Sequence, residues 1–143
     1  MSEPKEINIL LVEDTEEHAL LIQRGLEEGP LKNRLFWVRD GEEAVDFLFN
    51  REKYASETDF PKPDIILLDL RLPKLSGSEA LEKTRSEARL RNTPVVVLTV
   101  SDQPEDILTC CRDGAQSYLL KSVAFAPKTE GVQSILNAII SLV

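Results

Sequence analysis

Three short apolar runs in this chain each end in side chains that could do chemistry. The run 7–12 is followed by Glu13 and Asp14, the run 65–68 by Asp69, and the run 95–98 by Thr99. A near-continuous Ile/Leu/Val run is typical of a strand buried on both faces of a parallel sheet. If these strands are parallel, their carboxyl ends lie at one edge of the sheet, which is where open α/β folds bind ligands. The pattern therefore predicts three carboxylates and a hydroxyl close together.

Segments with helical periodicity alternate with the apolar runs along the whole chain. The expected strands are 7–12, 35–38, 65–68, 95–98 and 117–120, and the expected helices cover about 16–28, 41–50, 78–89, 104–113 and 129–142. This alternation predicts a doubly wound α/β fold, with a parallel sheet, right-handed crossovers and helices on both faces. The polar stretch 51–63 is the one long connection that we expect.

The composition is that of a single globular domain. The 143 residues are 42% hydrophobic and 29% charged, with a formal net charge of −8, and this length supports one hydrophobic core. No basic stripe suits a nucleic-acid backbone, no apolar run approaches the roughly 20 residues of a membrane span, and the N-terminus does not resemble a signal peptide. The adjacent Cys110 and Cys111 make no disulfide framework. We expect a cytoplasmic domain over 1–143, with neither nucleic acid nor membrane as a partner.

The acids Glu13, Asp14 and Asp69 predict a site for a hard divalent cation. Crowded carboxylates repel one another, and Mg²⁺ characteristically binds a few carboxylates together with water. Lys121 follows the last expected strand and would add a positive charge at the same edge. A cation and an ammonium group that face one carboxylate, with the Thr99 hydroxyl nearby, could receive a phosphoryl group on that carboxylate.

Each of these residues also has a structural explanation when it is taken alone. An acidic pair can cap a helix, Asp69 can be a turn residue, Thr99 can end a strand, and Lys121 can be a surface lysine. The only histidine, His18, lies one helical turn after Asp14, and we expect it to face solvent rather than to transfer phosphate. The order of the other residues on successive strands is what favours a joint site.

With these features the chain closely resembles the receiver domains of two-component response regulators. The matching segments cover nearly the whole chain and read ILLVEDTEEH, VRDGEEAVDFL, PDIILLDLRLPKLSG, VVVLTVS and YLLK. The resemblance implies a flavodoxin-like (βα)5 fold with strand order 2-1-3-4-5. It also implies a stand-alone switch without an output domain, which receives a phosphoryl group from a histidine kinase. Its only chemistry would be Mg²⁺-dependent self-phosphorylation and slow self-dephosphorylation.

The family's roles carry over to the residues in matching positions. Asp69 would be the phosphoacceptor, and Asp14 and Asp69 would ligate Mg²⁺ directly. Glu13 would act on the ion through water, and the backbone carbonyl of Arg71 would be a further ligand. Lys121 would pair with the phosphoryl oxygens.

The resemblance also implies a two-state switch. The chain departs from the family pattern at one position after Lys121. Thr99 would close on the phosphoryl group while Tyr118 swings into the space that it leaves. Family members usually follow the lysine with a cis-proline, but Ser122 follows Lys121 here. Because a cis bond at a non-proline residue costs about 3 kcal/mol, we expect a trans bond and a differently shaped loop.

The segment FLFNREKY and the long loop after it narrow the resemblance. They resemble the single-domain regulators that serve cyanobacterial and bacterial phytochrome-type histidine kinases. This implies a homodimer through the face formed by the expected helix 104–113, strand 117–120 and helix 129–142, or through the edge formed by that strand and the last helix. The apolar residues that could build this interface, or equally pack in the core, are Val123, Phe125, Ile135, Ile139 and Ile140.

Two other functions remain as alternatives. A phosphohydrolase of similar topology would commonly carry a second acid two residues after the nucleophile, where this chain has Arg71. A pseudo-receiver, which binds partners without phosphorylation, would be expected to lack one of the acids or the lysine. None of these is missing, but Ser122 in place of the usual proline keeps the pseudo-receiver open as an alternative.

Overall fold

The computed structural model describes residues 6–29, 32–69, 77–99, 115, 117–120, 137, 139 and 141. The elements in chain order are β1 (Ile7–Val12), α1 (Glu16–Glu28), β2 (Asn33–Val38), α2 (Gly41–Leu48), the 3₁₀ helix η1 (Glu52–Tyr54), β3 (Ile65–Asp69), α3 (Gly77–Ser86), β4 (Val95–Thr99) and β5 (Ser117–Leu120). Residues 137, 139 and 141 are also helical.

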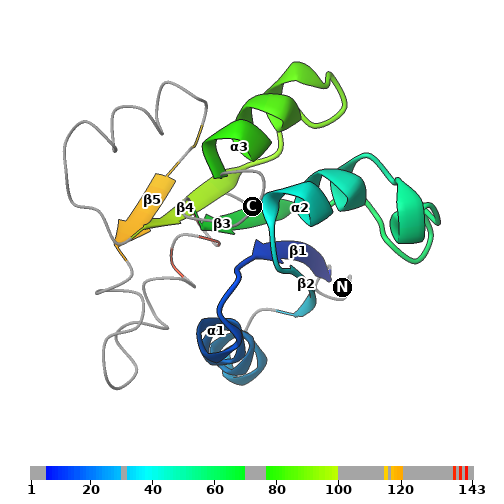
Figure 1. Cartoon of the computed structure of the whole chain (residues 1–143). Coiled ribbons are helices and arrows are strands. Elements are labelled where there is room, and N and C mark those ends of the chain that lie inside the picture. Colours follow the sequence, from blue (N-terminus) through cyan, green and yellow to red (C-terminus); the bar gives the residue numbers. More distant parts are fainter. Residues whose placement is uncertain are drawn as a thin grey trace.

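The strands form one parallel sheet in the order β2-β1-β3-β4-β5 (Figure 1). This confirms the predicted fold class and strand order. All of β3 and the last four residues of β1 are buried, as the apolar runs predict for central strands of a sheet that is covered on both faces.

Helices cover the sheet on both sides. In Figure 1, α1 lies below the sheet, whereas α2 and α3 lie above it. One buried cluster joins the sheet to α2 and α3 through residues such as Phe47, Leu48 and Leu81. The other joins it to α1 through Ala19, Ile22 and Leu26. Because all neighbouring strands are parallel, their carboxyl ends lie at one edge of the sheet, where the candidate site is formed.

Several element ends differ from the predicted ones. β2 begins at Asn33 rather than at residue 35, because its pairing with β1 starts at Asn33 opposite Ile7. α2 ends at Leu48 rather than at Asn50, since Asn50 has a left-handed backbone with φ of 52° that cannot continue a right-handed helix. α3 ends at Ser86 rather than near residue 89, and turns follow it.

The connection 51–63 is more ordered than its polar composition suggests. It contains η1, and Tyr54 within it is only 7% exposed. The rings of Tyr54 and Phe60 pack with Phe36 of β2 and Phe47 of α2 at centroid distances between 4.9 and 6.5 Å. An aromatic cluster therefore attaches this connection to one edge of the sheet.

Several predictions concern residues outside the part of the chain that the structure describes. These are the helix 104–113, most of the helix 129–142, and Arg71, Cys110, Cys111, Lys121, Ser122, Val123, Phe125, Ile135 and Ile140. Ile139 is described, is fully buried and belongs to the cluster beneath α1, so it is core material rather than part of a dimer surface.

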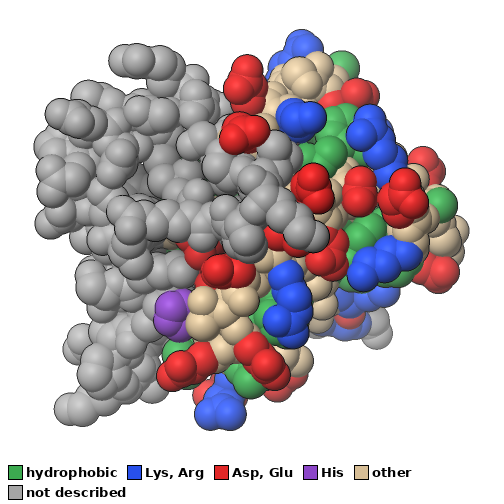
Figure 2. Space-filling model, viewed as in Figure 1, with side chains coloured by type: hydrophobic (Ala, Val, Ile, Leu, Met, Phe, Trp, Pro, Cys, Tyr) green, Lys and Arg blue, Asp and Glu red, His purple; other side chains and the backbone are tan. Residues whose placement is uncertain are grey.

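Two further features of the described residues are the length of their helices and the charges on their surface. No helix among the described residues is long and apolar enough to cross a membrane. On the face shown in Figure 2, the basic side chains of the described residues are interspersed with acidic ones. Such a mixed surface is unlike the continuous basic footprint of a nucleic-acid-binding protein.

Candidate metal and phosphoryl site

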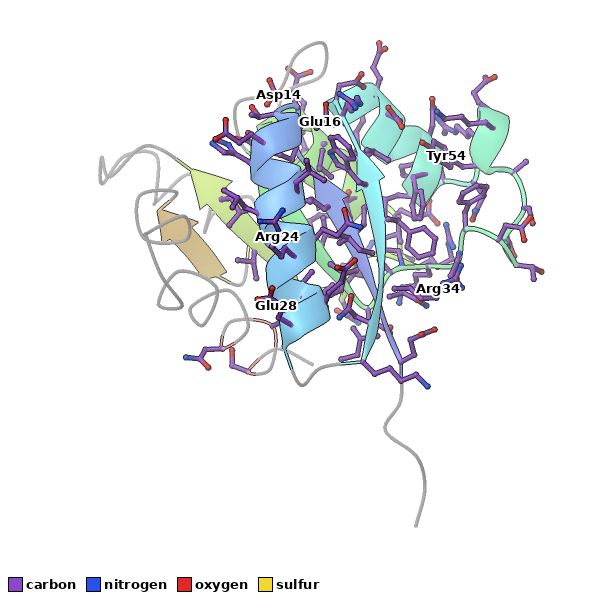
Figure 3. All side chains as sticks on the ribbon, turned by 90° about the horizontal axis from the view of Figure 1, so that it is seen from below. Asp14, Glu16, Arg24, Glu28, Arg34 and Tyr54 are labelled. Atoms are coloured by element: carbon purple, nitrogen blue, oxygen red, sulfur yellow. The ribbon has the colours of Figure 1, made fainter. Side chains whose placement is uncertain are left out.

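Three carboxylates come together where β1 and β3 end. Carboxylate oxygens of Glu13, Asp14 and Asp69 all lie within 4.8 Å of one another. The two strands are neighbours in the sheet, and Val12 pairs with Leu68, so the residues that follow this pair emerge side by side. Figure 3 shows Asp14 beside the N-terminal end of α1. The predicted convergence of these acids is confirmed.

The three acids differ in their exposure to solvent. Glu13 is fully buried and Asp69 is 3% exposed, whereas Asp14 is exposed. Burial removes water from two of the charges, which makes their mutual repulsion strong and a cation between them favourable. The donor set consists only of oxygens, which suits a hard ion such as Mg²⁺. The exposed Asp14 leaves one side of the cluster open to an incoming group.

The carboxylate of Glu13 is also directed toward the start of α1. Its Oε1 atom accepts a hydrogen bond from the backbone N–H of Thr15 at 3.2 Å, and His18 Nδ1 lies 3.6 Å from the same oxygen. The Thr15 hydroxyl contacts Asp14 Oδ1 at 3.4 Å. The first turn of α1 therefore orients two of the three acids. The His18 side chain is 33% exposed, and its contact with Glu13 was not expected from the sequence.

The backbone of Glu13 is tied to β2. Its N–H donates to the carbonyl oxygen of Val38 at 3.0 Å, and its carbonyl oxygen accepts from Trp37 Nε1 at 2.7 Å. No sequence motif pointed to Trp37, because an aromatic residue in a strand is most often a packing residue.

The predicted switch residues are described by their backbone positions. Thr99 ends β4, one residue beyond Leu98, which pairs with Asp69. Tyr118 lies in β5 opposite Val97. Thr99 is therefore at the same edge of the sheet as the carboxylates. The predicted roles of the Thr99 and Tyr118 side chains, and those of Lys121 and Arg71, concern groups outside those that the structure describes.

Residues 9–132 match the family described as the response regulator receiver domain. The chain belongs to this family. The match spans most of the chain and includes every residue of the carboxylate cluster. Among curated relatives, the probable methanogenesis regulatory protein FilR2 of Methanothrix harundinacea is 40% identical over 127 residues, covering 89% of this chain and 79% of FilR2.

Phytochrome-associated regulators are also similar to this receiver. Response regulator Rcp1 of Synechocystis is 38% identical over 114 residues, covering 80% of this chain and 76% of Rcp1. A crystal structure of Rcp1 in its Mn²⁺-bound form has a TM-score of 0.79 at 32% identity, covering 94% of this chain and 92% of that one. The crystal structure of the phosphorylated cyanobacterial phytochrome response regulator RcpA has a TM-score of 0.83 at 34% identity, covering 94% of this chain and 91% of that one. The resemblance predicted from FLFNREKY is confirmed.

Proposed function

We propose that this receiver is a phosphorylation switch in which Asp69 accepts a phosphoryl group from the phosphohistidine of a sensor kinase. The observation that carries this proposal is the cluster of Glu13, Asp14 and Asp69, whose oxygens lie within 4.8 Å of one another at the carboxyl edge of the sheet. Asp69 is the member of the cluster that ends the central strand β3, and the resemblance to the family supports it as the acceptor.

The transfer itself is a displacement at phosphorus. A carboxylate oxygen of Asp69 attacks the phosphorus atom, the new O–P bond forms as the N–P bond breaks, and the imidazole leaves with the electron pair and takes up a proton. A divalent cation bound by Asp14, Asp69 and the Arg71 carbonyl, with Glu13 acting through water, would supply positive charge for the phosphoryl oxygens. The Mn²⁺-bound form of Rcp1 supports a divalent ion in such a cluster.

The remaining roles follow the family pattern. Lys121 would pair with the phosphoryl oxygens, and the Thr99 hydroxyl would contact the same group while Tyr118 turns inward. The position of Thr99 at the end of β4 supports this assignment. The output would then be a changed surface for protein contacts in the cytoplasm, rather than catalysis on a separate substrate.

The proposal is tested by intact mass after incubation with acetyl phosphate and Mg²⁺. The unaltered chain should gain about 80 Da, the mass of one phosphoryl group in place of a proton, and Asp69→Asn should gain nothing. Asp59→Asn is the matched control, because it makes the same change at an exposed position of the connection after α2. No gain in the unaltered chain, with cation binding intact, would favour the pseudo-receiver. Phosphate release much faster than the slow self-dephosphorylation expected of a receiver would favour a phosphohydrolase.

The kinase partner that we propose is a phytochrome-type histidine kinase. Similarity to RcpA and Rcp1, which extends over most of each chain, supports this choice. Comparing phosphotransfer to the receiver from such a kinase and from an unrelated histidine kinase tests it. Equal transfer rates from both kinases would contradict the assignment.

We also propose a homodimer through the face formed by the expected helix 104–113, strand 117–120 and helix 129–142. Because Ile139 is buried in the core, the contact would rest on Val123, Phe125, Ile135 and Ile140. Sedimentation of the chain with and without acetyl phosphate would measure the assembly. A monomer under both conditions would contradict the dimer and leave the phosphorylation proposal unaffected.

A further inference from the structure

Trp37, the only tryptophan of the chain, links β2 to the turn that carries two of the three site carboxylates. Its indole N–H donates a hydrogen bond of 2.7 Å to the backbone carbonyl of Glu13, and Val38 accepts from the Glu13 N–H at 3.0 Å. Both backbone polar groups of Glu13 are therefore bound by β2. In Figure 3 this strand is the cyan arrow between α1 and the segment that carries Tyr54, and it contributes no carboxylate to the cluster.

The indole is itself held in place by its surroundings. The partly buried Trp37 ring packs against the cluster beneath α1, and the guanidinium carbon of Arg39 lies 4.3 Å from the ring centroid. A cation over an aromatic face is an attractive arrangement. Packing on the core and the contact with Arg39 restrict the ring, so its N–H points at the Glu13 carbonyl from a fixed position.

The Glu13 carbonyl lies at the place where regular sheet pairing ends. Val12 is the last residue of β1 and pairs with Val38, and the chain then leaves the sheet to enter α1. The indole supplies a hydrogen-bond donor to this first carbonyl of the turn. The carboxylates of Glu13, Asp14 and Asp69, which this turn helps to carry, lie within 4.8 Å of one another and repel. A turn that is fixed against this repulsion needs less reorganisation when a cation binds.

We infer that Trp37 is a positioning residue of the divalent-cation site, acting through the backbone of Glu13 to keep Glu13 and Asp14 in place beside Asp69. This inference rests on the proposed function insofar as the three acids bind a cation. The competing explanation is that Trp37 only packs β2 onto the core. That role would affect the stability of the fold and leave the affinity for the cation unchanged.

The test measures Mn²⁺ binding to the full chain by electron paramagnetic resonance. Trp37→Phe keeps an aromatic ring on the core but lacks the N–H. Loss of an outer-shell hydrogen bond at a metal site typically costs 10- to 100-fold in affinity. We expect a rise in Kd at the low end, about 10-fold, because this bond is to the backbone carbonyl of Glu13. Phe36→Leu is the control, because Phe36 lies on the same strand but packs with the opposite cluster. It should lower the melting temperature and leave Kd unchanged.

A second measurement keeps the inference testable even if Trp37→Phe fails to fold. The single indole N–H of the unaltered chain gives one resonance in a ¹⁵N correlation spectrum. This resonance should shift during a Mg²⁺ titration and reach its plateau together with cation binding. An unchanged Kd in Trp37→Phe, or an indole resonance that does not move through saturation, would overturn the positioning role alone. No Mn²⁺ binding by the unaltered chain would overturn the cation site as well.

Discussion

The hydroxyl of Tyr54 donates a hydrogen bond to the carboxylate of Glu43, and this bond joins η1 to the first turn of α2. Lys53 lies 3.6 Å from the same carboxylate. Burial raises the pKa of Tyr54 above its usual value, and the hydrogen bond to Glu43 and the negative charges of Glu43, Asp46 and Asp40 raise it further. The connection after α2 is thus held by a polar contact as well as by its aromatic cluster.

Removing the Tyr54 hydroxyl should destabilise the domain. A hydrogen bond to a charged acceptor contributes about 1.5–3 kcal/mol, and the accessibility of Glu43 to solvent puts Tyr54→Phe at the low end, about 1.5 kcal/mol at pH 7. Urea unfolding measures the change. In a double-mutant cycle with Glu43→Gln, the two residues should couple by about 1 kcal/mol; additive effects would show that the bond contributes little.

The burial of Tyr54, together with this bond, should make stability depend on alkaline pH. The folded-state pKa of Tyr54 lies above the ordinary value of about 10. The unfolded chain therefore loses its phenol proton first, and the stabilisation that is complete below pH 10 is lost as the pH rises further. The free energy of unfolding should fall less steeply above pH 10 in Tyr54→Phe than in the unaltered chain. Parallel curves for the two proteins would contradict this.

Asn50 should also stabilise the start of the same connection. Its side-chain amide donates to the carbonyls of Tyr54 and Phe60 at 3.0 Å each, and its φ of 52° is left-handed. Asn50→Gly loses both hydrogen bonds, but glycine adopts the left-handed conformation without strain, so we expect the free energy of unfolding to fall by about 2 kcal/mol. Asn50→Ala should cost about 1 kcal/mol more, because its Cβ disfavours this backbone. Equal unfolding free energies for the two variants would exclude the backbone contribution.

The central strands and the carboxylate cluster could be predicted from the sequence because one physical pattern encodes both. Strands buried on two faces leave apolar runs, and the acids that follow those runs must emerge at one edge of a parallel sheet. β2 was predicted less well, since it is an edge strand and its first residues, Asn33 and Arg34, are polar. Most residues of β2 are only partly buried, and its first two are polar, so its start carries little apolar signal.

Contacts between segments far apart in the sequence were the part that could not be predicted. The run 51–63 has the composition of a loop, yet it is held by an aromatic cluster whose partners lie on β2 and α2. The bond from Trp37 to Glu13 spans 24 residues. Neither contact follows from periodicity or local propensity, because each depends on how the elements pack.

Divalent cations should stabilise the fold through the three acids. A ligand at 100 times its Kd raises the free energy of unfolding by about 2.7 kcal/mol, so Mg²⁺ should raise the melting temperature of the unaltered chain. Asp14→Asn removes one of the crowded charges, and it should be at least as stable as the unaltered chain in EDTA but gain much less from Mg²⁺. Calorimetry with both additives measures this. The same gain in both proteins would place the cation elsewhere.

The exposed face of α1 should contribute to recognition of the kinase. Leu20 and Leu21 are 47% and 41% exposed, on the helix whose first turn lies beside Asp14 (Figure 3). A kinase domain that delivers its phosphohistidine to Asp69 must approach this end of the sheet, where it can bury the two leucines.

Loss of about 1 kcal/mol of apolar burial per side chain predicts that Leu20→Ser and Leu21→Ser each lower the kcat/KM for phosphotransfer about fivefold. Phosphorylation by acetyl phosphate should be unchanged, since a small donor needs no docking surface. Glu27→Ser, at an exposed position near the far end of α1, is the control. A variant that loses both reactions equally would show that the leucines support the site itself rather than the contact with the kinase.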